Sequence, residues 1–309
     1  MGNSLAACRD PRHMHGMTAR LLILGLGYAG RAIAAEALRA GFQVSGTSRD
    51  PVGTAAPEGV TLLRFAEAGP AIAGATHLVA TVAPGEDGDP VLAAHAGAIA
   101  EARDLRWVGY LSTTGVYGDR GGDWVDEQTP PAPGQERSRR RLAAEQAWAA
   151  ALGGRCALDL FRTAGIYGPG RSALDEVRSG RARRVLRPGH SFSRIHVEDI
   201  ARALVAAASG PHGMAPRVLH LADDTPAESA VVTEEAARLL GAPLPPAVPF
   251  EEAWKGMSPM GRGFWAENRR VRSAATQAAL GLSWRYPSFR EGLAAILRVE
   301  QANQSLLQQ

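Results

Sequence analysis

The sequence lacks most features that place a chain outside the cell or in a membrane. It has two cysteines, Cys8 and Cys156, in 309 residues, too few for a framework of several disulfides and without the spacing of a metal site. A reducing, cytoplasmic compartment is therefore predicted. No apolar run approaches the roughly 18 residues needed to cross a bilayer. Residues 1–18 also lack the continuous apolar stretch of a signal peptide.

The charge pattern of a nucleic-acid-binding chain is missing as well. The formal net charge is +3, and the arginines are dispersed without interleaved aromatic side chains. Hydrophobic residues make up 45% and charged residues 21%, the balance of an ordinary globular protein. These values predict no nucleic-acid or membrane partner and favour a small anionic ligand. Residues 1–18 are interpreted as a disordered extension, with Met14 or Met17 as an alternative start.

Glycine, by contrast, is abundant, and three glycines follow a short apolar run in an informative order. Residues 21–24 are typical of a buried strand, and an alanine-rich helical stretch and a second strand, 42–47, follow the glycines. In a dinucleotide-binding turn the first glycine permits the turn, the second lets the backbone approach the pyrophosphate, and the third allows close packing. Helix N-terminal amides then face the phosphates. The predicted cofactor-binding residues of this turn are Gly25, Gly27, Tyr28, Ala29 and Gly30.

The end of the second predicted strand bears on the choice of cofactor. Ser48 and Arg49 stand where this architecture meets the adenine ribose. An arginine there accommodates a 2′-phosphate, which favours NADP. The alternative assigns the ribose to Asp50, whose carboxylate would accept a hydrogen bond from the free 2′-hydroxyl of NAD.

Further motifs follow along the chain. Together with the glycine turn they resemble the extended short-chain dehydrogenase/reductase family, also called the NAD-dependent epimerase/dehydratase family, from about residue 19 to residue 204. The segments that carry the resemblance are Leu-Ser-Thr-Thr-Gly-Val-Tyr-Gly (111–118), Asp-Glu-Gln-Thr-Pro (126–130), Leu-Ala-Ala-Glu (142–145), Phe-Arg-Thr-Ala-Gly-Ile-Tyr-Gly-Pro-Gly (161–170) and Ile-His-Val-Glu-Asp-Ile (195–200).

This resemblance implies an α/β fold: a doubly wound parallel sheet of the Rossmann type with a smaller C-terminal substrate lobe. The dinucleotide-binding core is expected over residues 19–165 and the substrate lobe mainly over 166–309, with segments at about 190–222 returning to the core. The implied partner is a small-molecule substrate, phosphorylated or linked to a nucleotide, and the implied assembly is a monomer or homodimer.

The resemblance also implies roles for single residues. Thr113 falls where the family places the hydroxyl that bonds the reacting oxygen, and Tyr167 where a loop meets the nicotinamide end and the substrate. The stretch 171–194 is rich in arginine, whose planar guanidinium suits anionic groups. Arg171 and Arg194 are the predicted substrate contacts, with solvated surface charge as the alternative. Segments 257–265 and 268–271 are expected to line the substrate cleft.

The sequence departs from the family at the residues that usually move the proton. The family carries Tyr-x-x-x-Lys before the Leu-Ala-Ala-Glu segment, and the matching positions here are Arg137 and Arg141. Arg141 can supply the cation that binds a ribose hydroxyl. Arg137 cannot replace the tyrosine, because a guanidinium stays protonated at any working pH. Tyr117 is the substitute that we hypothesise for the proton.

A second departure concerns the reaction class. The family's sugar-nucleotide dehydratases carry an acidic pair where this chain has Thr114 and Gly115, so a dehydratase is disfavoured. Both departures are similar to those of atypical members, including the YeeZ-like branch. The sequence therefore predicts an NADP(H)-dependent oxidoreductase or epimerase-like enzyme acting on a small anionic hydroxyl or carbonyl compound. The alternative is a catalytically degenerate protein that binds NADPH as a sensor or regulator.

Overall fold

The parallel sheet predicted from the sequence forms the centre of the molecule. The computed structural model describes residues 19–307, so the predicted extension and alternative starts lie outside the described residues. Its seven-stranded sheet has the order β11-β7-β5-β4-β1-β2-β3, and every pairing is parallel. The strands are β1 (Arg20–Leu24), β2 (Gln43–Ser48), β3 (Thr61–Arg64), β4 (His77–Ala80), β5 (Trp107–Thr113), β7 (Ala157–Thr163) and β11 (Arg217–Leu221).

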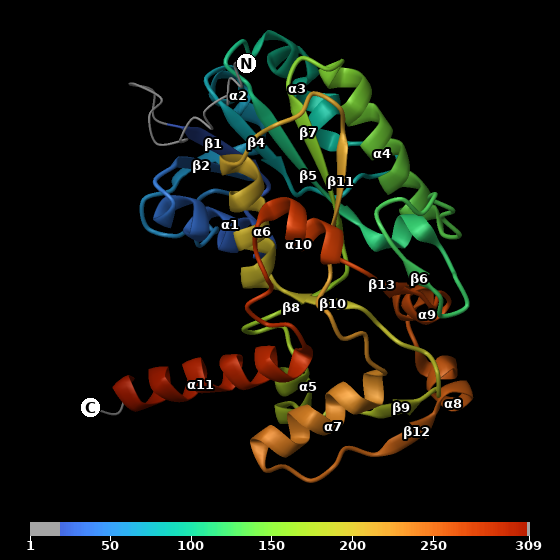
Figure 1. Cartoon of the computed structure of the whole chain (residues 1–309). Helices are drawn as coiled ribbons and strands as arrows, with labels where there is room; N and C mark the ends of the chain where they lie inside the picture. Colours follow the sequence, from blue (N-terminus) through green and yellow to red (C-terminus); the bar gives the residue numbers. More distant parts are fainter. Residues whose placement is uncertain (1–18, 308–309) are drawn as a thin grey trace, which may run out of the picture.

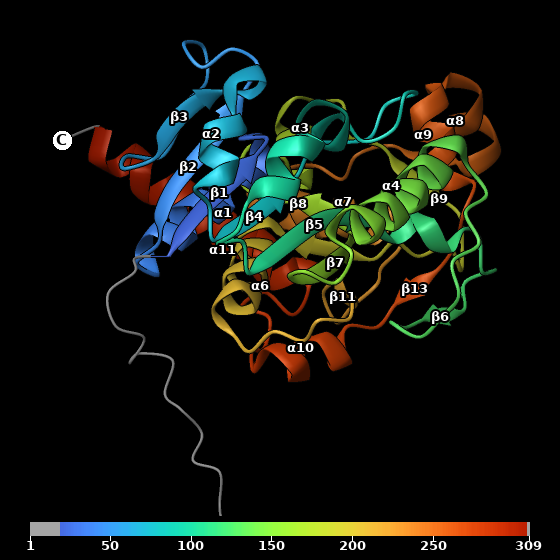
Figure 2. The ribbon, with the colours of Figure 1, turned by 90° about the horizontal axis from the view of Figure 1, so that it is seen from above.

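Helices cover both faces of this sheet, which confirms the doubly wound Rossmann fold (Figures 1 and 2). On one face α1 (Tyr28–Arg39) packs beside α6 (Val197–Ser209), and their apolar residues share one core with the strands. On the other face lie α2 (Gly69–Ala73), α3 (Pro90–Glu101) and α4 (Glu136–Leu152), with a second core. The strands are buried from both sides, which explains their nearly continuous apolar sequence.

The order of the strands locates the ligand-binding edge. From β1 the chain runs outward to β2 and β3, then returns to place β4 on the other side of β1. In such sheets ligands bind at the carboxyl ends of the strands where this reversal occurs. The turn after β1 and the residues after β4 and β5 therefore lie at that edge.

A second group of elements lies beyond this edge (Figure 1). Residues of α5 (Ala173–Arg178), α7 (Ser229–Leu240) and α11 (Phe289–Leu307) share a third core that includes Leu174, Val232 and Phe289. Three two-stranded parallel sheets accompany them. Their strands are β8 (Gly165–Tyr167) with β10 (Arg194–His196), β9 (Arg184–Leu186) with β12 (Ala247–Pro249), and β6 (Trp124–Val125) with β13 (Arg270–Val271).

The remaining elements are short. They are two 3₁₀ helices, Phe65–Glu67 and Thr114–Tyr117, and the helices α8 (Phe250–Gly256), α9 (Pro259–Trp265) and α10 (Ala274–Leu280). Segments 197–209 and 217–221 leave the second group and pack on the main sheet as α6 and β11. None of the helices within 19–307 is both long and apolar enough to cross a membrane.

Candidate functional site

The glycine turn after β1 is held from two sides. Gly25 has a φ of +105°, and a Cβ there would lie 2.6 Å from Thr81 Oγ1. The Gly25 amide donates to Thr47 Oγ1 at 3.0 Å, and the Leu26 amide donates to the Thr47 carbonyl at 2.7 Å. Thr81 Oγ1 donates to the Gly25 carbonyl at 2.6 Å. The neighbouring strands β2 and β4 thus fix the path of the turn.

The other two glycines have different surroundings. A Cβ on Gly30 would collide with the Gly25 carbonyl oxygen, so this glycine allows the helix to pack against the turn. A Cβ on Gly27 would meet no atom within 4 Å. Gly27 is also the N-cap of α1, which has no side-chain cap and no acidic residue in its first turn. The first turn, which begins with Tyr28 and Ala29, therefore presents amides to open space, and this arrangement fits a pyrophosphate.

Ser48 and Arg49 lie at the end of β2, near this turn. Ser48 Oγ accepts from the Asp50 amide at 3.2 Å and lies 2.6 Å from Thr54 Oγ1. The Arg49 side chain is exposed and makes no ion pair within residues 19–307, while its carbonyl accepts from Arg64 Nη1 at 3.1 Å. The Arg49 guanidinium is thus available to an outside ligand.

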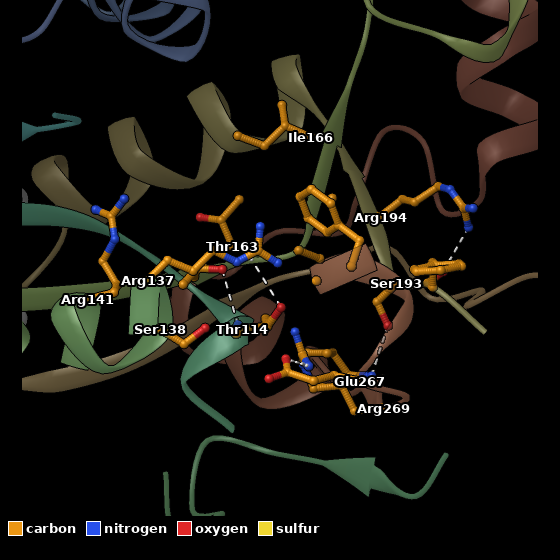
Figure 3. Close-up of a pocket in the computed structure, with 18 of the residues that line it drawn as sticks. Thr114, Arg137, Ser138, Arg141, Thr163, Ile166, Ser193, Arg194, Glu267 and Arg269 are labelled. Atoms are coloured by element: carbon orange, nitrogen blue, oxygen red, sulfur yellow. Dashed lines mark hydrogen bonds and ion pairs between the residues drawn. The ribbon is translucent and has the colours of Figure 1, made fainter. Parts of the chain in front are cut away.

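A cavity of about 550 Å³ opens at the carboxyl edge of the sheet. Its walls come from the ends of β5 and β7, the start of α4, the β8–β10 pair and the α9–β13 segment (Figure 3). Segments far apart in the sequence therefore meet around one space. The lining residues used below are Thr113, Arg137, Ser138, Arg141, Tyr167, Arg194, Phe264, Glu267 and Arg269.

Thr113 is the last residue of β5 and faces this cavity. Its Oγ1 accepts from the Gly115 amide at 3.1 Å, which leaves the hydroxyl proton free to donate elsewhere. Ser138 lies beside it: a Cβ on Gly115 would be 2.8 Å from Ser138 Oγ and 3.4 Å from Thr113 Oγ1. Two hydroxyl groups thus converge next to Gly115.

The two arginines at the Tyr-x-x-x-Lys positions both reach the cavity from α4. Arg141 is held in place, because its Nη1 donates to the Leu111 carbonyl at 2.8 Å and to the Tyr110 hydroxyl at 3.1 Å. Arg137 instead lies on an aromatic ring, with its guanidinium carbon 4.3 Å from the centroid of Phe264. Neither has a carboxylate partner within the described residues.

Tyr117 does not reach the cavity, which corrects the hypothesis that it handles the proton. Its side chain is fully buried, and its hydroxyl contacts His220 Nε2 at 2.5 Å and accepts from Arg162 Nη1 at 2.9 Å. Arg162 in turn forms a buried ion pair with Glu145 at 2.7 Å. Burial raises the pKa of Tyr117 to about 12. The 3₁₀ turn after Thr113 directs this ring into the interior, so the position supports a structural role.

Tyr167 lines the cavity with its ring but turns its hydroxyl away. The hydroxyl donates to the Ser288 carbonyl at 3.3 Å, and the ring packs against Gly292 of α11. Burial raises the pKa of this phenol. The side chain therefore contributes a wall of the cavity and no exchangeable proton.

Arg171 and Arg194 both line a second cavity, and Arg194 lies between this cavity and the main one. The guanidinium carbon of Arg171 is 5.6 Å from the centroid of Tyr28, whose hydroxyl donates to the Pro169 carbonyl at 3.1 Å. The second cavity has a volume of about 570 Å³. Arg194 lines both cavities, and its Nη1 donates to the Phe192 and Ala227 carbonyls at 2.8 and 3.0 Å. Burial lowers the pKa of Arg194 to about 10.

Comparison with known proteins shows which chains share this sequence and fold. A functionally unknown conserved protein from Silicibacter pomeroyi DSS is 43% identical, with a TM-score of 0.83, and the match covers 92% of this chain and 99% of that chain. Protein YeeZ of Escherichia coli (strain K12) is 27% identical over 288 residues, 87% of this chain and 96% of YeeZ. No protein-family model matches the chain.

The chain has the fold of NAD-dependent epimerases and dehydratases, the proteins that its sequence motifs resemble. The fold of MoeE5, solved in complex with UDP-glucuronic acid and NAD, matches it with a TM-score of 0.72 at 19% identity, over 92% of this chain and 100% of that chain. In the family that the sequence resembles, the positions of Arg137 and Arg141 carry the Tyr-x-x-x-Lys pattern. These two arginines are therefore the departures that bear most on proton transfer. Both cations stand beside Thr113 on the wall of one cavity.

Several residues that line the cavity belong to none of the sequence motifs. Ser138 lies in the sequence between the expected positions Arg137 and Arg141, and only the fold shows that it is close to Thr113. Glu267 and Arg269 form an ion pair of 2.7 Å on the cavity wall, more than 120 residues after α4 begins. Both fall in or beside segments 257–265 and 268–271, where the sequence predicted a cleft without assigning roles. Within residues 19–307 no group of three or more His, Cys, Asp or Glu side chains could hold a metal ion.

Proposed function

We propose that the chain is an NADP(H)-dependent oxidoreductase or epimerase-like enzyme that acts on a small anionic hydroxyl or carbonyl compound. One observation carries this proposal: an uncapped helix N-terminus with open space at Gly27 lies at the same sheet edge as a 550 Å³ cavity that contains Thr113 and unpaired arginines. Dinucleotide and substrate would meet at that edge.

The residues that would hold the cofactor come from three segments. Within the turn formed by Gly25 to Gly30, the free amides at the start of α1 would bind the pyrophosphate, and Arg141 would bind the nicotinamide ribose. Arg49 would bind the 2′-phosphate of NADP, with Asp50 and NAD as the alternative. When bound, the nicotinamide ring exchanges a hydride with the substrate carbon. The NAD found with MoeE5 supports a nicotinamide cofactor for this fold.

The chain's own residues would then orient the substrate. Thr113 would donate a hydrogen bond from its hydroxyl group to the reacting oxygen, and the hydroxyl group of Ser138 lies on the same side of Gly115. Arg171 and Arg194 are the proposed contacts for a more distant anionic group on the substrate. Arg137 keeps its charge at working pH and therefore binds rather than exchanges protons.

Cofactor titration followed by a substrate screen tests the proposal. The purified chain is titrated with NADPH and with NADH by fluorescence, and hydroxyl and carbonyl compounds are then screened by NADPH absorbance. Saturable NADPH binding with turnover of an anionic compound is expected. The absence of affinity for either coenzyme would remove the proposal.

The second candidate function is NADPH sensing without turnover. It is favoured by Arg137, which occupies the proton-relay position and lies on Phe264 at the cavity wall. In that case the chain binds NADPH saturably but turns over no compound in the screen. The same two measurements therefore separate the two functions.

A further inference from the structure

The charges around the main cavity are unbalanced. Four arginines line it, Arg137, Arg141, Arg194 and Arg269, and the one acidic residue among the described lining residues is Glu267. That carboxylate pairs with Arg269 at 2.7 Å. The other three arginines have no carboxylate within ion-pair distance in the described part of the chain. Such an excess of positive charge around a cavity favours an anionic ligand.

Two of these three arginines already donate to backbone carbonyls. Arg141 donates to the Leu111 carbonyl, and Arg194 donates to those of Phe192 and Ala227. Arg194 also enters from the side opposite Arg137, and its guanidinium points away from the α4 arginines (Figure 3). The Arg137 guanidinium, by contrast, donates no hydrogen bond to another described residue. All of its donors are therefore free for a ligand.

Neighbouring residues restrict the conformation of the Arg137 side chain. Its guanidinium stacks on Phe264, and the helix that carries this ring is tied to the start of α4 by a 2.6 Å bond from Gln135 Nε2 to the Gly263 carbonyl. A Cβ on Gly263 would lie 2.5 Å from Gln135 Oε1 and 3.4 Å from Arg137 Nη2, so the close approach needs glycine. A planar guanidinium held in this way loses little freedom when it binds a planar anion.

The neighbours of Arg137 identify which anion fits. The next residue, Ser138, and Thr113, where the proposed reacting oxygen lies, both place their hydroxyl groups beside the Cα of Gly115. Because Arg137, Ser138 and Thr113 line one cavity, one small molecule could place an anionic group on Arg137 and its reacting oxygen on the two hydroxyl groups. One unpaired guanidinium balances a single negative charge, which matches a carboxylate better than a phosphate dianion.

We propose that the cavity binds a hydroxy acid or the corresponding oxo acid, with its carboxylate on Arg137 and its hydroxyl or carbonyl oxygen on Thr113 and Ser138. The reaction of this acid rests on the proposed function, whereas its binding does not. The arginine that replaces the family's tyrosine is then the residue that selects the substrate.

Two pairs of probes test the inference. Oxamate and malonamate carry a carboxylate one or two carbons from an amide carbonyl, and oxamide and malonamide are their neutral counterparts. Dissociation constants are measured by calorimetry for the full chain, with and without NADPH. We expect at least one of the acids to bind, its neutral counterpart to bind much more weakly, and inorganic phosphate not to displace it.

Matched variants locate the site. Arg137→Gln should weaken binding of the acid about tenfold or more, the usual effect of losing a charge-assisted hydrogen bond. Arg139→Ala is the control, since Arg139 is on the same helix but pairs with Glu136 outside the cavity. Circular dichroism melts check that both variants fold. A melt of Arg137→Gln that shows unfolding moves the test to Phe264→Ala, which removes the stacking partner and should also weaken binding.

The outcomes separate this inference from the proposed function. Failure of both acids to bind the wild-type chain, equal binding to Arg137→Gln, or stronger binding of phosphate overturns the inference. Binding of NADPH in the same samples leaves the proposed function standing in that event. Acid binding that depends on Arg137 without any NADPH affinity supports the inference and removes the proposed function.

Discussion

At the scale of single residues, an arginine at position 137 changes what the cavity wall can do. A phenol can exchange a proton when a nearby cation holds its pKa down, whereas a guanidinium keeps its charge. Arg137 has a ring beneath it and no carboxylate partner in the described chain. Under the proposal above, the position that resembles the family's proton-moving tyrosine would instead hold negative charge.

We expect Arg49 to decide between the two nicotinamide cofactors. Its exposed guanidinium has no ion-pair partner within 19–307, so Arg49→Ala should weaken NADPH binding about tenfold or more, the loss expected for a charge-assisted contact. NADH, which has no 2′-phosphate, should bind the variant nearly as well as wild type. Fluorescence titration of both coenzymes measures the difference, with Arg39→Ala, at the far end of α1, as the control. Equal losses for the two coenzymes would instead assign the ribose to Asp50.

Asp223, directly after β11, makes stability depend on pH. It is buried, its Oδ1 accepts from the Thr225 amide at 3.3 Å, and its Oδ2 has no hydrogen-bond partner in the described structure. Burial raises its pKa from 3.8 to about 8, although Arg194 opposes the shift. The folded chain thus holds the proton more tightly than the unfolded chain, and this group lowers stability as the pH rises from 3.8 to about 8, with no further loss above.

Asp223→Asn removes this titration while keeping the oxygen that accepts from Thr225. We expect the variant to be more stable than wild type at pH 8.5, with a gain roughly 4 kcal/mol larger than that at pH 5, because about three pH units of this titration lie between the two. Urea unfolding at the two pH values measures both gains. A gain that is equal at the two pH values would show that Asp223 does not titrate between them.

Residues of the site were predictable from the sequence only where a motif fixes their spacing. Thr113, Arg137 and Arg141 could be assigned by counting from neighbouring motifs, and the fold brings all three to one cavity. Tyr117 belongs to the same motif, yet the turn after Thr113 buries its ring. Ser138 and Glu267 have no motif, because their place on the wall depends on tertiary packing between α4 and the segment after α9.

At the scale of elements, a substitution in the glycine turn can change cofactor binding without changing stability. Gly27 has φ −78° and open space around a Cβ, so Gly27→Ala should leave the melting temperature unchanged. The added methyl would enter the space proposed for the pyrophosphate and should weaken NADPH binding about tenfold or more, since the phosphate would lose helix amide bonds. Gly97→Ala, whose Cβ also meets nothing within 4 Å, is the matched control on α3. Undiminished NADPH affinity in Gly27→Ala would place the cofactor elsewhere.

Elements with strong periodicity were predictable, and short ones were not. The strand–helix–strand unit at the start of the chain follows from apolar runs and glycines and matches β1, α1 and β2. β12 has three residues and ends in a proline, so only its parallel partner β9 defines it as a strand. The same holds for the pairing of β6 with β13, whose register no local pattern records.

At the scale of the whole molecule, the sheet and the second group of elements are tied together. The chain leaves the sheet after β7, returns as α6 and β11, and leaves again before α7. The buried carboxylate of Asp199 on α6 accepts from the amides of Arg285 and Tyr286, at 2.8 and 2.9 Å, just before α11. Tyr28 on α1 reaches the Pro169 carbonyl. These links predict that both parts unfold together.

Cofactor binding provides a test of this coupling. NADPH at a concentration of about 100 times its dissociation constant should stabilise the folded chain by roughly 2.7 kcal/mol, through mass action alone. If unfolding is one transition, the slowest-exchanging amides of α7, which lie far from the glycine turn, should gain as much protection as those of β5. Hydrogen exchange followed by mass spectrometry measures both in one experiment. Protection that rises in β5 but not in α7 would show that the second group opens independently, and then the cavity between them would be held together by ligand contacts rather than by the fold.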